Sequence, residues 1–158
     1  MTMFKYSWIA FVTFLLDQTS KFAALYFLAR GPVEVTPFFN LALAFNTGAA
    51  FSFLSDAGGW QNFFFAVIAA VVSVGILVVI RRLGANDKQV AVSLWLILGG
   101  ALGNLSDRLY HGYVVDFIDV YYRAWHWPTF NIADSAIFIG AVLLILDSIG
   151  VGFGKRRQ

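Results

Sequence analysis

The stretch that decides the fold runs through residues 99–108 (GGALGNLSDR), 114–119 (VVDFID) and 130–135 (FNIADS). Four of the nine acidic residues of the chain lie in it, at positions 107, 116, 119 and 134. Long apolar runs flank the stretch on both sides. Carboxylates at the edge of a hydrocarbon phase are costly, and those that are kept there usually have a function. The stretch therefore predicts a functional site at a membrane boundary.

The composition of the chain indicates a membrane-embedded protein. Of the 158 residues, 59% are apolar and only 13% are charged, unlike an ordinary soluble domain. There is no cysteine, which excludes disulfides, thiolate metal sites and cysteine nucleophiles. The formal net charge is only +2, and no basic patch with interleaved aromatics is present, so we expect no nucleic-acid partner.

Four apolar runs, at about residues 8–28, 63–80, 90–105 and 132–149, are near the length of roughly 20 helical residues that crosses a bilayer. We therefore expect an all-α membrane protein with four transmembrane helices, in a single domain over residues 1–158. The DQTSK sequence at residues 17–21 interrupts the first run, which is not typical of a cleaved signal peptide. In the third run, Gly99 and Gly103 have a spacing that favours close helix packing.

Two outer segments separate these runs, at about residues 30–60 and 107–130. In the first, proline and glycine residues surround an alternating pattern at Leu41, Leu43 and Phe45, which predicts a small, partly β element. The second is rich in tyrosine and tryptophan, which is typical of the interface between membrane and water. We expect these two segments to clamp a substrate from above, through residues 38–55 and 109–129.

The distribution of basic residues predicts the orientation. Seven lie on the side that holds both predicted termini, and three lie on the other side. Because basic residues accumulate in short cytoplasmic loops, we expect both termini in the cytoplasm and the outer segments on the opposite face. The seven are Lys5, Arg81, Arg82, Lys88, Lys155, Arg156 and Arg157, and the three are Arg30, Arg108 and Arg123.

Other chemistries receive little support from the sequence. The chain has two histidines, His111 and His126, fewer ligands than a catalytic zinc normally has, so we expect no metal and no cofactor. A serine–lysine pair of Ser106 and Lys21 is conceivable, but no spacing brings the two together. Asp17 and Lys21 are four residues apart on one helix face, and we interpret them as an ion pair that braces the bundle.

Paired aspartates remain as the candidate chemistry. Asp116 is flanked by apolar residues on both sides, which is unusual for a solvated loop acid. Asp134 follows Asn131 by three residues, a spacing typical of a helix-capping arrangement that also directs Asp134 toward the outer segment. We interpret Asp107 as a local partner of Arg108. Asp119 is either solvated or a partner of Arg123 at helical spacing. The favoured pair is Asp116 with Asp134.

Two carboxyl groups that are close together in a poorly solvated place cannot both ionise easily, so they share a proton. The ionised member takes a proton from water while the neutral member hydrogen-bonds the carbonyl under attack. Such a pair hydrolyses a peptide bond without a cofactor.

Five sequence blocks together resemble lipoprotein signal peptidase, the signal peptidase II family of bacterial inner-membrane aspartic peptidases. They are DQTSK (17–21), FNTGAAF (45–51), GGALGNLSDR (99–108), VVDF (114–117) and FNIADS (130–135). The resemblance covers nearly the whole chain. It implies that Asp116 and Asp134 are catalytic, that Asn46, Gly48, Asn104, Arg108 and Asn131 line the substrate site, and that Asp17, Lys21 and Asp107 support it.

The resemblance also implies the substrate and the surroundings of the enzyme. The substrate would be a prolipoprotein whose cysteine carries diacylglycerol, cleaved on the amino-terminal side of that cysteine, and the inhibitor would be globomycin. The enzyme would act as a monomer among the lipids of the bacterial inner membrane, with its active site at the outer face.

Two other classes of function remain open. One is a proton-coupled transporter in which Asp17, Lys21, Asp116 and Asp134 form a relay across the membrane. The clustering of the acids near one face and the absence of a visible inverted repeat are unfavourable to it. The other is a structural subunit without chemistry.

Overall fold

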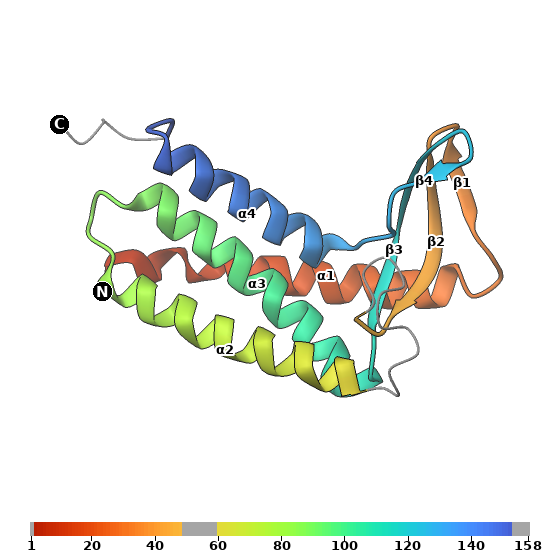
Figure 1. The fold of residues 1–158 in the computed structure, drawn as a ribbon, viewed down its shortest axis with the longest axis horizontal. Coiled ribbons are helices and arrows are strands. Elements are labelled where there is room, and N and C mark those ends of the chain that lie inside the picture. Colours follow the sequence, from red (N-terminus) through yellow and green to blue (C-terminus); the bar gives the residue numbers. More distant parts are fainter. Residues whose placement is uncertain (1, 49–59, 153–158) are drawn as a thin grey trace.

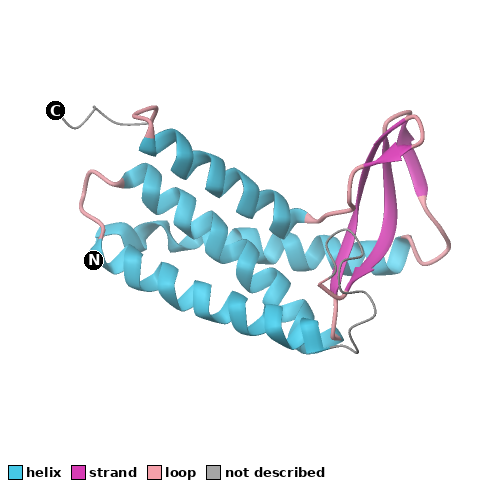
Figure 2. Cartoon of the chain, in the orientation of Figure 1, coloured by secondary structure: helices cyan, strands magenta, loops and turns pink. Residues whose placement is uncertain are grey.

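The apolar runs of the sequence form helices, and the stretch rich in proline and glycine between the first two runs forms strands. The computed structural model describes residues 2–48 and 60–152. Figure 1 and Figure 2 show a helical bundle with a small sheet at one end. The helices are the 3-10 helix η1 (Thr2–Tyr6) and the α-helices α1 (Ser7–Phe27), α2 (Trp60–Arg82), α3 (Lys88–His111) and α4 (Ile132–Ser148).

The sheet is antiparallel and draws on both outer segments. Its strands are β1 (Val33–Thr36), β2 (Phe39–Asn46), β3 (Val114–Tyr122) and β4 (Trp125–His126), in the order β1-β2-β3-β4. The expected combination of a mainly helical chain with a small β element is confirmed. The second outer segment was expected to be interfacial, and it supplies the strand β3 beside β2. In the register of these two strands, Ala44 lies opposite Asp116.

Helix α3 packs against α1, α2 and α4, and glycines permit the close approach. A Cβ added at Gly99 would lie 2.7 Å from the Thr13 Cβ and 2.8 Å from the Ala10 carbonyl oxygen, both on α1. A Cβ at Gly103 would collide with the Asp17 carboxylate. The predicted packing role of both glycines is confirmed, and Gly103 also leaves space for a charged side chain.

Helix α3 is longer than the sequence pattern predicts. The third run was expected to end near residue 105, whereas α3 continues to His111 and ends at Gly112, whose φ of 80° is the left-handed conformation that terminates helices. As a result, Asp107 and Arg108 lie on the last turns of a helix and not in an outer loop. Their positions are therefore fixed relative to Asn104.

Two helices, α2 and α3, are long and apolar enough by composition to cross a membrane. Helix α1 carries Asp17 and Lys21 in its interior, and α4 has 17 residues. Figure 1 shows η1, the end of α4 and the α2–α3 connection at the end of the bundle opposite the sheet. The expected features at residues 49–51 and 155–157, and the clamp residues 49–55, lie outside the described residues.

Candidate active site

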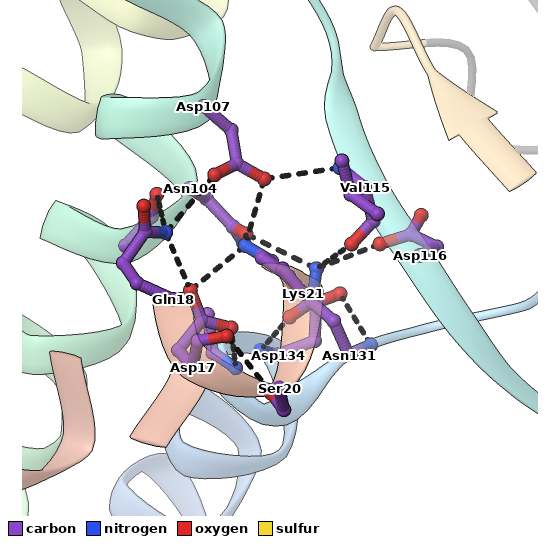
Figure 3. Close-up of polar contacts among 12 residues, drawn as sticks. Asp17, Gln18, Ser20, Lys21, Asn104, Asp107, Val115, Asp116, Asn131 and Asp134 are labelled. Carbon is purple, nitrogen blue, oxygen red and sulfur yellow. Dashed lines mark hydrogen bonds and ion pairs between the residues drawn. The ribbon is translucent and has the colours of Figure 1, made fainter. Parts of the chain in front are cut away.

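Asp116 and Asp134 come from different elements and are joined by one side chain, that of Asn131. Asp116 lies on β3, and Asp134 lies in the first turn of α4. The Asn131 Nδ2 donates to Asp116 Oδ1 at 2.7 Å, and the Asn131 Oδ1 accepts from the Asp134 backbone N–H at 2.9 Å. Figure 3 shows the three side chains together. We call Asp116 and Asp134 the carboxyl pair.

The start of α4 positions Asp134. Asn131 is the N-cap residue, and the Asp134 Oδ2 accepts from the Asn131 N–H at 3.3 Å, which completes a capping box. The predicted capping arrangement is confirmed. The other carboxylate oxygen, Oδ1, accepts from Asn104 Nδ2 on α3 at 2.7 Å. Both oxygens of Asp134 are therefore oriented by amide donors.

Asp116 is the more deeply buried member of the carboxyl pair, with only 2% of its surface exposed. Burial, and after it the nearby Asp134 carboxylate, raise the pKa of Asp116 from 3.8 to about 7. Hydrogen bonds from Asn46 and Asn131 act in the opposite direction. Asp116 is thus a group that holds a proton near neutral pH, as an acid–base residue requires.

A buried ion cluster lies behind the carboxyl pair. We call Asp17, Gln18, Lys21 and Asp107 the lysine cluster. Lys21 Nζ lies 2.8 Å from Asp17 Oδ2 and 2.9 Å from Asp107 Oδ2, and it donates to Asn104 Oδ1 at 2.9 Å. The predicted Asp17–Lys21 pair is present, but it is part of a larger network. With two carboxylates and an amide around its ammonium, Lys21 is not a free base for Ser106.

The lysine cluster also fixes the backbone on both sides of the carboxyl pair. Asp17 Oδ1 accepts from the Ala133 N–H at 2.8 Å, beside Asp134. Asp107 Oδ2 accepts from the Val115 N–H at 3.0 Å, beside Asp116. Asp107 was interpreted as a local partner of Arg108, and this is corrected: it pairs with Lys21 and the β3 backbone. Figure 3 shows the contacts of Asp107 with Lys21 and Val115.

Arg108 and Asn46 border the carboxyl pair. Arg108 Nη1 donates to the Asn104 carbonyl oxygen at 3.3 Å, and its guanidinium interacts electrostatically with both members of the pair. Its Nε is buried and has no hydrogen-bond partner among residues 2–48 and 60–152. Asn46 Nδ2 donates to Asp116 Oδ2 at 3.1 Å.

Gly48 shapes the turn that follows Asn46. Its N–H donates to Asn46 Oδ1 at 2.8 Å, which fixes the orientation of the Asn46 amide. Its φ is +104°, a conformation that residues other than glycine rarely adopt. A Cβ here would also meet the Phe65 ring at 2.5 Å. The backbone turn that directs Asn46 toward Asp116 therefore requires glycine.

Asp119 belongs to a separate contact on the sheet. Its two oxygens lie 2.8 Å and 3.0 Å from His126 Nδ1, and its Oδ2 accepts from Asn40 at 3.3 Å. Both expectations for Asp119, a solvated acid and a partner of Arg123, are wrong, because residues 114–122 form a strand on which helical spacing does not apply. Arg123 instead lies over the Tyr122 ring.

The structure brings together every predicted site residue and adds one that the sequence analysis did not single out. Gln18 Nε2 lies within hydrogen-bonding distance of Asp107 Oδ1 at 3.0 Å and Asp17 Oδ2 at 3.1 Å. Gln18 could have been identified from the sequence, because it lies inside an apolar run between the charged residues Asp17 and Lys21. Within the described ranges, no group of three histidine or acidic residues is arranged to hold a metal.

A cavity of about 550 Å³ lies beside the lysine cluster, lined by residues of α1 and of the end of α3. Its lining includes Lys21, Asp107 and Val115 and exposed aromatic residues such as Phe22 and Tyr110, but neither Asp116 nor Asp134. The cavity is thus distinct from the space next to Asp116 and Asp134.

Comparison with known proteins identifies the family. A family model described as signal peptidase II matches residues 9–150. A lipoprotein signal peptidase of Alteromonas mediterranea is 50% identical over 99% of this chain and 87% of its own length. One of Polynucleobacter necessarius is 48% identical over 100% of this chain and 97% of its own.

Solved structures agree with the sequence relatives. A bacterial membrane enzyme solved at 1.9 Å resolution superposes with a TM-score of 0.80 and 31% identity, covering 92% of each chain. A second bacterial membrane enzyme has a TM-score of 0.78 and 30% identity, covering 98% of this chain and 94% of its own. The chain therefore belongs to the signal peptidase II family.

Proposed function

We propose that this protein is an aspartic endopeptidase that removes signal peptides from diacylglyceryl-modified prolipoproteins, cutting on the amino-terminal side of the lipidated cysteine. The observation that carries the proposal is the single amide of Asn131 that contacts both Asp116 and Asp134. Both carboxyl groups accept from this one residue, Asp116 from the Asn131 side chain and Asp134 from the Asn131 backbone N–H. With one of them titrating near neutral pH, they have the arrangement that aspartic hydrolysis requires.

The reaction follows from the two protonation states of the carboxyl pair. The ionised carboxylate takes a proton from water, whose oxygen attacks the scissile carbonyl carbon. The neutral carboxyl group gives its proton to the carbonyl oxygen, and a tetrahedral diol forms. Return of a proton to the peptide nitrogen breaks the carbon–nitrogen bond. The products are the carboxylate of the signal peptide and the free amino group of the lipidated cysteine.

The surfaces of the helices support a membrane position with four spans. On α2, large apolar side chains such as Phe63, Val71 and Val74 are more than 60% exposed, and Phe11 and Phe22 on α1 are also exposed. Such side chains suit lipid and are unfavourable in water. We propose that α1, α2, α3 and α4 all cross the inner membrane of a bacterium and that the chain forms one domain.

The proposed orientation places both termini in the cytoplasm and the carboxyl pair at the outer face. The basic residues Lys5, Arg81, Arg82 and Lys88 lie at the end of the bundle opposite the sheet, in accord with the positive-inside rule. Arg30 and Arg123 lie near the sheet. At the outer edge of the hydrocarbon, the carboxyl pair meets a substrate whose signal helix and acyl chains are dissolved in the bilayer.

We propose that the amide and guanidinium groups around the carboxyl pair bind the substrate. Arg108 Nε is a buried donor without a partner in the described part of the chain, which suits a substrate carbonyl or lipid ester oxygen. Asn46, Gly48, Asn104 and Asn131 would line the same site. The outer segments at residues 38–55 and 109–129 would clamp the substrate, and globomycin would compete with it. The enzyme would act as a monomer among membrane lipids.

Purified protein incubated with a diacylglyceryl-modified lipobox peptide tests the proposal. Cleavage before the lipidated cysteine, blocked by globomycin, is expected for the wild type and for Thr13→Val, which alters a buried α1 residue that packs against Gly99 of α3. Asp116→Asn and Asp134→Asn should remain folded and inserted but fail to cleave. Normal processing by either variant would reject the carboxyl pair.

A proton-coupled transporter is not supported. Asp17, Lys21, Asp116 and Asp134 would form its relay, but they lie in one connected network near the sheet end of the bundle. A relay needs groups spaced across the membrane.

A further inference from the structure

We infer that Lys21 acts through Asn104 to keep Asp134 ionised, so that the proton shared by the carboxyl pair resides on Asp116. The inference rests on the proposed function, in which one aspartate acts as the base and the other as the acid. It assigns these two roles to particular residues and makes Lys21 a positioning residue.

Lys21 has one hydrogen-bond acceptor for each of its three donors. An ammonium group has three donors. They face three acceptors, Asp17 Oδ2 at 2.8 Å, Asp107 Oδ2 at 2.9 Å and Asn104 Oδ1 at 2.9 Å. Lys21 is 2% exposed, so water does not compete with these partners. Two carboxylates and one amide oxygen hold the Lys21 ammonium in one position.

Lys21 fixes the orientation of the Asn104 side-chain amide. Because Lys21 can only donate, the Asn104 atom that faces it is the oxygen. The nitrogen is therefore directed to Asp134 Oδ1, at 2.7 Å. The positive charge of Lys21 polarises the amide and strengthens this bond. The orientation makes Asp134 an acceptor on that oxygen, and a polarised donor binds a carboxylate more strongly than a neutral carboxyl group.

The position of Asp134 on α4 also favours its ionised form. Asp134 occupies the third residue of the helix, where the N-terminal end of the helix dipole favours negative charge. Its second oxygen accepts from the Asn131 backbone N–H at 3.3 Å. By solvent exposure Asp134 is intermediate, whereas Asp116 is buried.

Asp116 has none of these advantages. It lies within β3 and not in a helix, and among the described residues its carboxylate accepts from the neutral side-chain amides of Asn131 and Asn46. The Asn131 Nδ2 is shared, since it also lies 3.2 Å from Asn104 Oδ1 and 3.3 Å from the Val115 carbonyl oxygen. Deep burial disfavours the charged form of Asp116. The shared proton is therefore more stable on Asp116 than on Asp134.

The other nearby charges do not reverse this order. Arg108 on α3 interacts with both members of the carboxyl pair and so favours neither decisively. Asp17 on α1 also interacts electrostatically with Asp134, but it and Asp107 on α3 are each paired with Lys21. Asp119 on β3 is directed to His126 and Asn40. The through-space charge of Lys21 reaches both aspartates, whereas its hydrogen-bonded route through Asn104 leads to Asp134.

The order of protonation is measured by NMR on protein labelled with 13C at the aspartate Cγ, in detergent micelles without substrate. The signals are assigned by their loss in Asp116→Asn and Asp134→Asn. We expect the Asp116 carbon to titrate near pH 7, with the Asp134 carbon at its ionised position at that pH. The reverse order, or a common midpoint, would overturn the inference.

The double variant Lys21→Gln with Asp107→Asn tests the role of Lys21. The wild-type cluster has two carboxylates and one ammonium, and the variant has one carboxylate, so the net charge of −1 is preserved. The amide oxygen introduced by Asp107→Asn can still accept from the Val115 N–H. We expect the acid limb of the kcat/KM profile to move to higher pH and kcat to fall about tenfold, with KM unchanged. Thr13→Val is the matched control.

The outcomes of these experiments are separable. An unchanged pH profile and titration order in the double variant would make Lys21 purely structural and overturn the inference, while cleavage by the wild type would still support the peptidase. Failure of the wild type to cleave would overturn the proposed function instead. If the double variant does not fold, the titration of the wild type alone decides where the proton resides.

Discussion

The lysine cluster and the carboxyl pair are two groups of carboxylates in contact with the same asparagine, Asn104, but they have different partners. Asp17 and Asp107 have a cation between them, Lys21, within 2.9 Å of each. Asp116 and Asp134 have amides as hydrogen-bond donors. A cation between two carboxylates lowers their mutual repulsion, whereas neutral amides do not remove the repulsion between two negative charges.

The difference separates a structural role from a chemical one. The lysine cluster has no need of a shared proton, and its oxygens bind the backbone of β3 and α4. The carboxyl pair relieves its conflict by holding a proton, which is the condition for acid–base catalysis. Variants of the carboxyl pair should therefore lose activity and keep their fold, and variants of the lysine cluster should lose stability.

Asp116→Asn or Asp134→Asn should reduce kcat for the lipidated peptide by about 10³-fold or more, because each removes one partner of the proton transfer. Folding should be preserved. Folding raises the pKa of Asp116 from 3.8 to about 7, so its ionisation destabilises the folded state as the pH rises between these values. Asp116→Asn should therefore be more stable than the wild type at pH 8. Thermal unfolding at acidic pH and at pH 8 measures this, and a less stable variant at pH 8 would contradict it.

Lys21→Met should lower the stability of the fold more than the variants of the carboxyl pair do. The change leaves Asp17 and Asp107 buried without their cation, which costs about 3–5 kcal/mol. Denaturation in mixed micelles gives the free energy of unfolding. Addition of Asp107→Asn should recover part of the loss, because one uncompensated charge is then removed. A Lys21→Met protein as stable as the wild type would show that the lysine cluster does not hold the bundle together.

Gly103→Ala should disturb the lysine cluster through packing, since the new Cβ collides with the Asp17 carboxylate. We expect a loss of about 1–3 kcal/mol in stability. Gly75→Ala on α2 is the matched control, because a Cβ there meets nothing within 4 Å. Equal stabilities of the two variants, from the same denaturation assay, would argue against the space requirement of Asp17.

His126→Gln should have the smallest effect. The His126–Asp119 contact lies on the sheet and its histidine side chain is 52% exposed, so its loss should change stability by no more than about 1 kcal/mol. Cleavage kinetics should stay at the wild-type level. A large fall in kcat would show that the His126–Asp119 contact contributes to catalysis, and would contradict its assignment to a site separate from the carboxyl pair.

Much of the site was predictable because its residues are chemically out of place in the sequence. Asp116 between apolar neighbours and Asp134 three residues after Asn131 both carry local signals, of unusual burial and of a capping box. The hydrogen bonds of Asp107 with Val115 and of Asp17 with Ala133 have no such local sequence signal. They are contacts to backbone N–H groups of other elements, which no side-chain pattern marks.

Strand β3 and the end of α3 were missed for a related reason. The first four residues of β3 are all buried, so the alternation that indicates a strand is absent. The last two turns of α3 contain Asn104, Asp107 and Arg108, whose partners lie inside the protein. A hydropathy pattern predicts that the membrane helix ends at such polar residues. The helix continues because these side chains form hydrogen bonds and ion pairs inside the protein.

The pH dependence of kcat/KM for the lipidated peptide tests the central claim, one proton shared by Asp116 and Asp134, most directly. Activity should rise as the first carboxyl group ionises and fall above pH of about 7, as Asp116 loses its proton. In Asp116→Asn, the residual rate should lack the alkaline limb. A wild-type rate that stays constant from pH 7 to alkaline pH would contradict a shared proton.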